Sequence, residues 1–253
     1  QRYNVIDTLY LSPLLFPKRP YHKLLKDEKL LVDELNNPVN DAKKARDLYY
    51  DEVDAWHSLS PEKKAIFYSL LRERREFAGF FRQNKVIFFN VDVISLILQE
   101  YDGKICVNAD LYYLVTQYPV ELSYALAVIG VDDALSLTPA WVMRNYPRVS
   151  NVLNVLRSVP CGCCSYCKDR LDSHRGLKMY FGYDGFRVFD GSPMQQQAVE
   201  AAIRGDSLLT IFPTGGGKSL TFQLPALMAG RNVHGLTVVI SPLQSLMKDQ
   251  VDN

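Results

Sequence analysis

The pattern of apolar and polar residues changes along the chain and divides it into three parts. Residues 1–56 contain a short apolar segment, VIDTLYLSPLLF, and a helical pattern that begins at Asp41. Residues 57–176 read as mostly helical. Their clearest helix is SPEKKAIFYSLLRERREFAGFF, in which Ser60 suits the N-cap, Pro61 takes the first helical position and apolar residues recur at helical spacing. The stretch VIFFNVDVISLILQ fits either a strand or a buried helix.

Residues 177–253 alternate between helical and strand-like patterns. MQQQAVEAAI predicts a helix and SLLTIF a buried strand; KSLTFQLPALMAG predicts a second helix, GLTVVI a second strand and LQSLMKDQV a third helix. A strand, turn, helix, strand and helix in this order are typical of the start of a parallel α/β sheet. We therefore expect an α/β fold whose mostly helical middle part precedes a parallel-sheet domain.

Composition narrows the class of protein. The chain has 253 residues, of which 47% are hydrophobic and 23% charged, and this balance is typical of a soluble globular protein. The net charge of +1 predicts no general attraction to nucleic acid, so any such contact depends on local patches. No apolar run approaches the roughly 18–20 residues of a membrane span, and no signal peptide is visible. We expect a cytoplasmic protein without membrane contact. Because the first residue is Gln1, we also expect a fragment of a longer chain.

The segment FPTGGGKS at residues 212–219 has the composition of a phosphate-binding loop. Three consecutive glycines let the backbone turn tightly with its amides pointing inward, and the predicted helix that follows adds its positive N-terminal end. Lys218 would reach the β- and γ-phosphates, and the Ser219 hydroxyl would hold Mg²⁺. The general pattern G-x-x-x-x-G-K-[ST] fails at its first position, Phe212, and an ordinary glycine-rich turn is the alternative. The expected ligands are ATP and Mg²⁺, and the nucleotide-binding residues are Thr214, Gly215, Gly216, Gly217, Lys218 and Ser219.

The sequence around this loop resembles RecQ-family DNA helicases of superfamily 2, in which P-T-G-x-G-K-S is usual. The resemblance covers LKMYFGYDGFRVFDGSPMQQQAVEAAIRGDSLLTIFPTGGGKSLTFQLPALMAG and GLTVVISPLQSLMKDQVDN, which lie within residues 177–253. It implies a RecA-like P-loop domain, and it implies that an aromatic residue, an Arg and a Gln hold the adenine ring. Tyr183, Arg187 and Gln195 match these positions, although FDGSPM inserts extra residues before Gln195. SPLQSLMKDQ resembles the motif that contacts single-stranded DNA, where Ser241 would hold a phosphate; a plain strand-to-helix turn is the alternative.

The resemblance implies an ATP-dependent enzyme that unwinds duplex DNA in repair or recombination, with Lys218 and Ser219 as catalytic residues. No D-E-x-H sequence follows the loop, so we expect this fragment to bind ATP and single-stranded DNA without hydrolysing ATP. A non-catalytic DNA-binding or scaffold protein that retains a helicase front end is the alternative. A different P-loop enzyme, such as a kinase, is disfavoured by TFQLPAL and SPLQSLMKDQ. The sequence does not identify protein partners.

Four of the five cysteines lie within seven residues, in VPCGCCSYCKDRLD. Cys161, Cys164 and Cys167 form C-x-x-C-x-x-C, a spacing at which thiolates share one tetrahedral Zn²⁺. Cys106 is the first choice for a fourth ligand, followed by Cys163 and His174. Free thiols and an iron–sulfur cluster are the alternatives. The cluster also resembles three ligands of the RecQ zinc module, which in that family follows the helicase lobes.

The first 56 residues resemble the C-terminal part of a DEDDh 3′–5′ exonuclease, through VIDT and NNPVNDA. Asp41 matches the metal-binding Asp of the late motif, whereas Asn36 stands where the family has its His. An amide cannot act as a general base, so we expect no DNA cleavage by this degenerate α/β segment. The alternative is that Asp41 caps the helix DAKKARDLYYDEV.

RERREFAGFFRQNK, in the helical middle part, combines cations with three phenylalanines. Such a mixture can bind single-stranded DNA. The more common arrangement is a charged helix surface over a phenylalanine core. The residues are Arg72, Arg74, Arg75, Arg82 and Lys85 among Phe77, Phe80 and Phe81.

Overall fold

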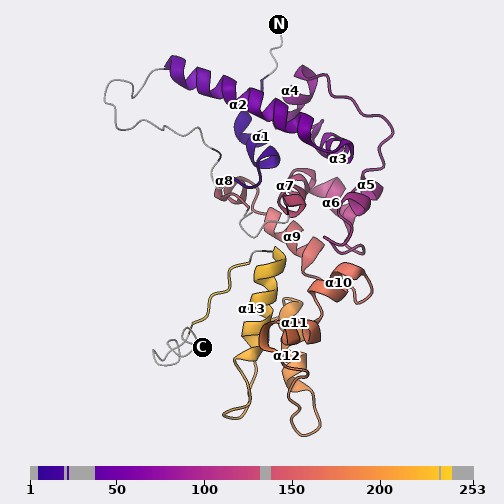
Figure 1. Ribbon diagram of the computed structural model, residues 1–253, viewed down its shortest axis with the longest axis vertical. Helices are drawn as coiled ribbons and strands as arrows, with labels where there is room; N and C mark the ends of the chain where they lie inside the picture. The colour runs from indigo at the N-terminus through magenta and orange to yellow at the C-terminus, as the bar shows by residue number, and fades with distance from the viewer. Residues whose placement is uncertain (1–4, 20–21, 23–37, 132–137, 234, 241–253) are drawn as a thin grey trace, which may run out of the picture. The chain divides into compact units, whose positions relative to one another are not determined.

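The computed structural model describes residues 5–19, 22, 38–131, 138–233 and 235–240, and these residues form two compact units, 1–169 and 170–253 (Figure 1). The helices of the first unit are α1 (Thr8–Leu15), α2 (Pro38–Ser58), α3 (Pro61–Leu71), α4 (Arg75–Gln83), α5 (Val93–Glu100), α6 (Leu111–Gln117), α7 (Pro119–Val131), α8 (Ala140–Asn145) and α9 (Val149–Arg157). The short α10 (Ser165–Arg170) ends at the boundary, and the second unit contains α11 (Ser173–Phe181), α12 (Met194–Ile203) and α13 (Leu220–Val233).

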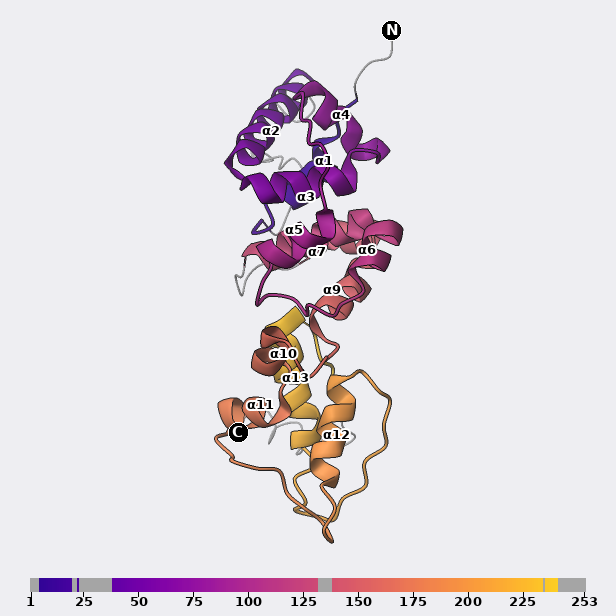
Figure 2. The same cartoon turned by 90° about the vertical axis from the view of Figure 1, so that its right-hand side faces the viewer.

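Helix α7 is the centre of the first unit. Its sequence, PVELSYALAVIGV, is apolar on nearly all sides, and a helix of this kind is stable only when it is surrounded by other elements. Helices α1, α3, α6 and α9 pack against it, and Figure 2 shows α6 and α9 beside it. Leu122, Ala125 and Leu126 are fully buried there. Among the described residues, none of the helices combines the length and the apolar character needed to cross a membrane.

The predicted helix that begins at Pro61 is confirmed, and its N-cap is formed as expected. The Ser60 hydroxyl accepts a hydrogen bond from the Lys63 amide at 3.2 Å, and Pro61 occupies the first turn. The single helix expected to run through Phe81 is instead two helices, because α3 ends at Leu71 and α4 begins at Arg75. The apolar spacing continues across residues 72–74, so it does not indicate that the helix is interrupted there.

Loss of the Ser60 hydroxyl is expected to destabilise the first unit. Replacing an N-cap serine by alanine costs about 1 kcal/mol of unfolding free energy, because a helix amide loses its acceptor. Urea denaturation of Ser60→Ala measures this cost. Ser58→Ala is the matched control, because the Ser58 hydroxyl only donates back to the Asp54 carbonyl of its own helix at 2.9 Å. Equal stability of the two variants would contradict the capping role.

The phenylalanines of RERREFAGFFRQNK belong to the core. Phe77 and Phe80 are completely buried and Phe81 nearly so, and Trp56 of α2 packs edge-on against Phe80 and Phe81. Rings in these positions cannot stack on bases. The cations among them are exposed. The structure therefore shows the more common arrangement, a charged helix surface over a phenylalanine core.

Residues 86–99, which fitted a strand or a helix, form a loop followed by α5. The Asp92 carboxylate caps α5, accepting from the Ser95 amide at 3.2 Å. The short length of the helical part explains the ambiguity, because eight residues are too few to establish a helical period.

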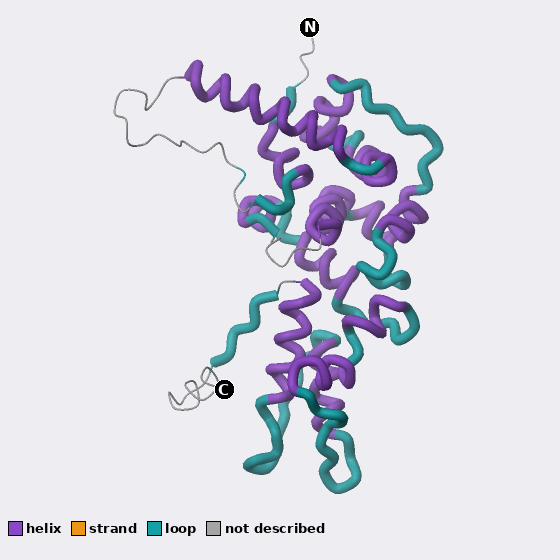
Figure 3. Tube along the Cα trace, viewed as in Figure 1, coloured by secondary structure: helices purple, strands orange, loops and turns teal. Residues whose placement is uncertain are grey.

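Neither predicted strand of the C-terminal part forms within the described residues. Residues 207–212 and 235–240 are extended and irregular, and Figure 3 shows both as loops. Most of their apolar side chains are exposed, with Leu209 88% and Ile240 89% accessible, whereas Phe212 is buried and stacks on Phe189. A strand needs hydrogen bonds from a second segment, and no such partner lies beside either segment in the described part of the chain. The expected parallel sheet is therefore not observed, and LQSLMKDQV and Ser241 lie outside the described residues.

The described part of residues 1–56 is also helical, so the α/β segment expected there is not observed. Helix α2 begins at Pro38, and Asp41 lies exposed within its first turn. Asp41 therefore does not occupy the N-cap position, which corrects that alternative. Asn36 lies outside the described residues, and the exonuclease resemblance stays a prediction. The predicted boundary at residues 56 and 57 falls inside α2.

The second unit is a three-helix cluster that carries the glycine-rich loop. Its core consists of Leu177 from α11, Val199 from α12 and Leu224 and Met228 from α13. Gly176 permits the close contact of α11 with α13, because a Cβ atom at this position would lie 2.8 Å from the Met228 sulfur. Both helices predicted for this unit's described residues, at 194–203 and 218–230, are confirmed as α12 and α13. The predicted boundary at residues 176 and 177 falls inside α11.

Candidate nucleotide-binding site and cysteine cluster

The glycine-rich loop joins the extended segment 207–212 to α13 by a tight turn. Gly215 and Gly217 have φ angles of 77° and 73°, a region that side-chain-bearing residues rarely adopt. The Gly216 amide donates to the Pro213 carbonyl at 3.0 Å. A Cβ atom at Gly216 would lie 2.9 Å from that carbonyl oxygen, and one at Gly217 would lie 2.6 Å from the Gln195 side chain. The backbone conformation therefore favours glycine at 215 and 217, and close packing favours it at 216 and 217.

An open cavity of about 590 Å³ lies beside this loop, entirely within the second unit. It brings together Tyr183, Arg187, Gln195, Gly217 and Ser219, which are five of the predicted nucleotide-binding residues. Its lining also includes Phe181, Asp184, Leu220 and Gln223. A volume in this range suits a ligand of nucleotide size.

Gln195 connects three parts of this site. Its side-chain oxygen accepts from the Arg187 amide at 2.8 Å, and its side-chain nitrogen donates to the Gly217 carbonyl at 3.0 Å. The Arg187 guanidinium donates to the Gly215 carbonyl. These bonds attach the segment before α12 to the glycine-rich loop. Gln195 thus contacts the loop directly, although it precedes Gly217 by 22 positions in the sequence.

The extra residues FDGSPM form a compact turn that preserves this contact. Phe189 and Ser192 exchange backbone hydrogen bonds of 2.9 and 2.8 Å, and the two residues between them, Asp190 and Gly191, have φ angles of 47° and 78°. Positive φ at both central residues is the geometry of a type I′ hairpin turn, which Asp-Gly favours. The insertion therefore projects as a hairpin and leaves Arg187 beside Gln195.

Lys218 and Ser219 occupy the end of the loop. The Lys218 ammonium group donates to the Phe212 carbonyl at 3.1 Å, which holds it across the loop. Ser219 lines the cavity directly, whereas Thr214 is exposed on the outer part of the loop. Tyr183 is 58% exposed, and its ring stacks on Phe181 at 6.3 Å with an interplanar angle of 15°. An aromatic surface of this kind is available to a planar ligand.

Sequence reasoning missed two features of the cavity. Gln223 belongs to α13 and lies four residues after Ser219, which directly precedes that helix. Residues four apart lie on one side of a helix, so the place of Gln223 in the cavity lining follows from helix periodicity. Asp184 also lines the cavity, and the Lys178 ammonium group 2.5 Å away holds the pKa of its carboxyl below the ordinary value. The sequence gives no signal for that pairing, because the two residues belong to different elements.

The cysteine cluster lies in the first unit and includes the first-choice fourth ligand. The sulfur atoms of Cys106, Cys161, Cys164 and Cys167 all lie within 4.8 Å of one another. Sulfurs bound tetrahedrally to Zn²⁺ at ~2.3 Å are roughly 3.8 Å apart, so the four thiols need only a small contraction. The bond from the Cys106 amide to the Leu156 carbonyl, 2.8 Å long, places the loop after α5 beside the end of α9.

Backbone amides point at the sulfur atoms of the cluster. The Cys164 amide donates to the Cys161 sulfur at 3.5 Å, and the Cys167 amide donates to the Cys164 sulfur at 3.3 Å. The amides of Cys163 and Cys164 lower the pKa of the Cys161 thiol to about 5, because they stabilise its thiolate. Burial raises the pKa of Cys106 and of Cys167. One thiolate therefore forms readily, and a bound cation would favour the others.

The other two candidates for the fourth ligand do not take part in the cluster. Cys163 is exposed; its sulfur lies 3.5 Å from the Cys161 sulfur and accepts a hydrogen bond from the Asn108 amide group at 3.2 Å. His174 belongs to the second unit, where its ring packs edge-on against Phe186 at 5.1 Å.

The C-terminal part of the chain is similar to a known protein family. Residues 192–253 match the family DEAD/DEAH box helicase. This segment includes α12, the glycine-rich loop and α13. No solved structure matches the chain.

Curated relatives match over the same region. The chain is 49% identical to "ATP-dependent helicase SGS1" of Saccharomyces cerevisiae over 77 residues, 30% of this chain and 5% of that protein. It is 50% identical to "ATP-dependent DNA helicase RecQ" of Haemophilus influenzae over 76 residues, 30% of this chain and 11% of that protein. For the RecQ protein of Synechocystis, identity is 41% over 85 residues, 34% of this chain and 16% of that protein. The C-terminal part is thus homologous to a short segment of RecQ-family helicases.

Proposed function

We propose that the second unit is the nucleotide-binding front end of a RecQ-like, ATP-dependent DNA helicase. The observation that carries this proposal is the convergence of Tyr183, Arg187 and Gln195 around one cavity with Gly217 and Ser219, the two residues of the glycine-rich loop that line it. The first three match an adenine-contacting motif, and the loop matches a phosphate-contacting one. A cavity lined by both kinds of residue is suited to hold the base of a nucleotide at one end and its phosphates at the other.

Lys218 and Ser219 would supply the phosphate end of this site. Loop amides and the N-terminal end of α13 provide partial positive charge, and the Lys218 ammonium group adds a full one. The Ser219 hydroxyl would bind Mg²⁺, whose chemistry is to neutralise charge on the phosphates. The bond between Lys218 and the Phe212 carbonyl keeps the ammonium group within the loop, where it can exchange that acceptor for a phosphate oxygen.

Gln195 would select the base. A side-chain amide has two N–H donors and two acceptor lone pairs on its oxygen. The bonds to Arg187 and Gly217 use one donor and one lone pair, so one of each remains. Adenine offers the complement, an N6 amino donor and an N7 acceptor, whereas guanine offers two acceptors, O6 and N7. The site is therefore expected to prefer adenine nucleotides.

The cysteine cluster would hold one structural Zn²⁺ through Cys106, Cys161, Cys164 and Cys167. Four thiolates with no open position are the donor set of a structural zinc site. The amide groups that point at the sulfur atoms fit such a site, because they offset the negative charge of the thiolates. The metal would join the loop that carries Cys106 to the segment 161–167.

Base selectivity tests the nucleotide site. ADP–Mg²⁺ is expected to bind the chain at least about tenfold more tightly than GDP–Mg²⁺, since a wrong base leaves polar groups unpaired. Gln195→Ala should remove most of this preference. Gln196→Ala is the matched control, because the neighbouring Gln196 side chain bonds only Glu200 of its own helix, at 2.8 Å. Competition against a fluorescent ADP measures the affinities of the parent chain and of both variants for ADP and GDP. Equal affinity of the parent chain for the two nucleotides would contradict the assignment.

A further inference from the structure

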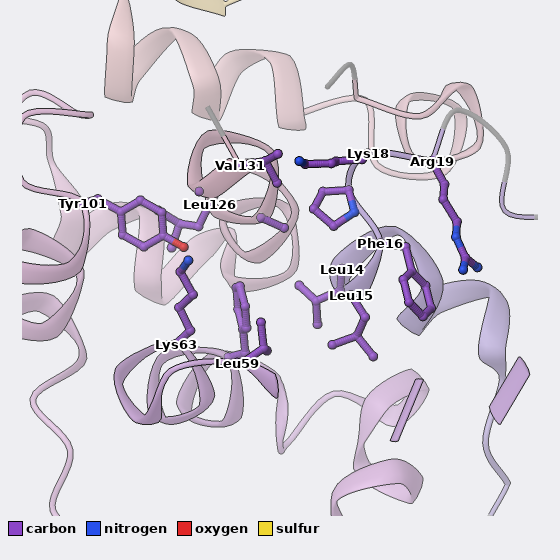
Figure 4. A pocket seen from close by; sticks show the side chains of 14 residues that line it. Leu14, Leu15, Phe16, Lys18, Arg19, Leu59, Lys63, Tyr101, Leu126 and Val131 are labelled. Atoms are coloured by element: carbon purple, nitrogen blue, oxygen red, sulfur yellow. The ribbon is translucent and has the colours of Figure 1, made fainter. Parts of the chain in front are cut away.

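The first unit contains a cavity of its own, far in sequence from the nucleotide site. It encloses about 350 Å³ between α1, α3, α7 and the end of α5 (Figure 4). Its walls are mainly apolar side chains, among them Leu14, Leu15, Phe67, Leu126 and Val131. Ligand pockets range from about 300 to 1,000 Å³, so this cavity has room for a compact ligand.

Two polar groups meet in this apolar cavity. The Tyr101 side chain is only 1% exposed, and its hydroxyl has no hydrogen-bond partner among the described residues. The Lys63 ammonium group lies beside it in Figure 4. Both approach Gly130 of α7, where a Cβ atom would lie 3.5 Å from the Tyr101 hydroxyl oxygen and 3.6 Å from the Lys63 nitrogen. Two hydrogen-bond donors therefore point to one place.

Both groups have donors to offer a ligand. Burial raises the pKa of the Tyr101 hydroxyl, which therefore stays neutral and able to donate. The Lys63 ammonium group pairs with the Glu100 carboxylate at 3.4 Å, and an ammonium group has three N–H donors. A buried donor without an acceptor costs free energy, so the position favours a ligand that brings an acceptor.

The charge of the lining is positive. Lys18, Arg19 and Lys63 contribute to it, and none of the lining residues that the structure describes is acidic. Figure 4 shows Lys18 reaching towards Val131, across the cavity from α3. The Arg19 guanidinium instead stacks on the Phe16 ring, 3.9 Å from its centre, at the rim. An anionic group would be attracted to the cavity, while the walls exclude a ligand that is polar throughout.

We propose that this cavity binds a compact monocarboxylate with an apolar body, such as a short fatty acid or an aromatic acid. The two carboxylate oxygens match the two donors, the Tyr101 hydroxyl and the Lys63 ammonium group. The hydrocarbon part would lie against Leu14, Leu126 and Val131. A phosphate is a poorer match, because a dianion needs more donors than the cavity walls offer.

Calorimetric titration of the whole chain with octanoate tests the proposal. One saturable site per chain is expected, and 1-octanol, which has the same chain length without the charge, should bind at least about tenfold more weakly. Gly130→Leu should abolish binding, because the new side chain fills the space beside the two donors. Lys63→Met should weaken binding about ten- to a hundredfold. Lys64→Met is the matched control on the same helix, since Lys64 donates to the His57 carbonyl outside the cavity, and it should leave binding unchanged.

Three results would overturn the proposal. They are no saturable binding of octanoate to the parent chain, equal affinity for octanoate and 1-octanol, and unchanged binding by a folded Gly130→Leu protein. If Gly130→Leu does not fold, Tyr101→Phe decides, because it removes a hydroxyl that has no hydrogen-bond partner in the described part of the chain and so leaves the packing intact. This variant should weaken octanoate binding at least about tenfold, and unchanged affinity would contradict the donor role.

Discussion

Removing zinc from the chain is expected to unfold the segment that contains the four clustered cysteines. Structural zinc contributes about 10–16 kcal/mol of apparent binding free energy at neutral pH, more than most domains have as total stability. Treatment with a strong chelator should therefore greatly increase amide hydrogen exchange in the loop that carries Cys106 and in residues 159–167. The helices around α7 should exchange more slowly, because their apolar core is independent of the metal.

Single cysteine variants identify the ligands. Elemental analysis should find one zinc per chain in the parent protein and none in Cys106→Ser or Cys164→Ser. Cys163→Ser is the matched control and should retain the metal, since the exposed Cys163 lies outside the four-sulfur group. Iron in place of zinc, or zinc retained by Cys106→Ser, would contradict the four-ligand site.

Lys218→Ala is expected to lower the affinity for ADP–Mg²⁺ about ten- to a hundredfold. The substitution removes a charge-assisted contact with the phosphates, which is worth roughly 1.5–3 kcal/mol. The fold of the unit should survive, because within the described residues the Lys218 side chain makes one hydrogen bond, to the Phe212 carbonyl of the loop. Isothermal calorimetry of the parent and the variant measures the change.

Arg204→Ala controls for the loss of a positive charge in the same unit. Arg204 is exposed and pairs with Asp206 at 3.0 Å, away from the cavity lining. Its removal should leave the affinity for ADP within about twofold of the parent value, because exposed ion pairs contribute little. If both variants lost affinity equally, the effect would be one of net charge and the phosphate role of Lys218 would be wrong.

Local signals in the sequence predicted much of the helical structure. Ser60 and Pro61 mark the start of α3, and the apolar spacing of MQQQAVEAAI and KSLTFQLPALMAG marks α12 and α13. The breaks between helices were harder to predict. Apolar periodicity continued from α3 into α4, so the irregular residues 72–74 gave no signal of their own.

The predicted strands show the limit of such reasoning. SLLTIF and GLTVVI have the composition of buried strands, but a strand exists only when another segment supplies its hydrogen bonds. Composition indicates whether a segment favours the extended conformation of a strand. Whether it pairs into a sheet depends on which other segments lie beside it. In the described residues both segments are extended and, apart from the buried Phe212, mostly exposed, so each adopts an extended backbone without joining a sheet.

The two sites were predictable to different degrees. The glycine-rich loop and the C-x-x-C-x-x-C spacing are contiguous in sequence, and their residues were identified directly. Cys106 is separated from Cys161 by more than fifty residues, and only its chemistry pointed to the cluster. The cavity between Tyr101, Lys63 and Gly130 had no sequence signal at all, because its residues come from three helical segments and a loop.

The central claim is that one cavity holds both ends of an adenine nucleotide. A crystal structure determined with ADP–Mg²⁺ tests this claim most directly. The predicted result places the β-phosphate at the amides of residues 215–218 and at the Lys218 ammonium group, with the adenine edge bonded to the Gln195 amide. A nucleotide bound elsewhere on the chain, or one whose adenine ring lies away from Gln195, Arg187 and Tyr183, would contradict it.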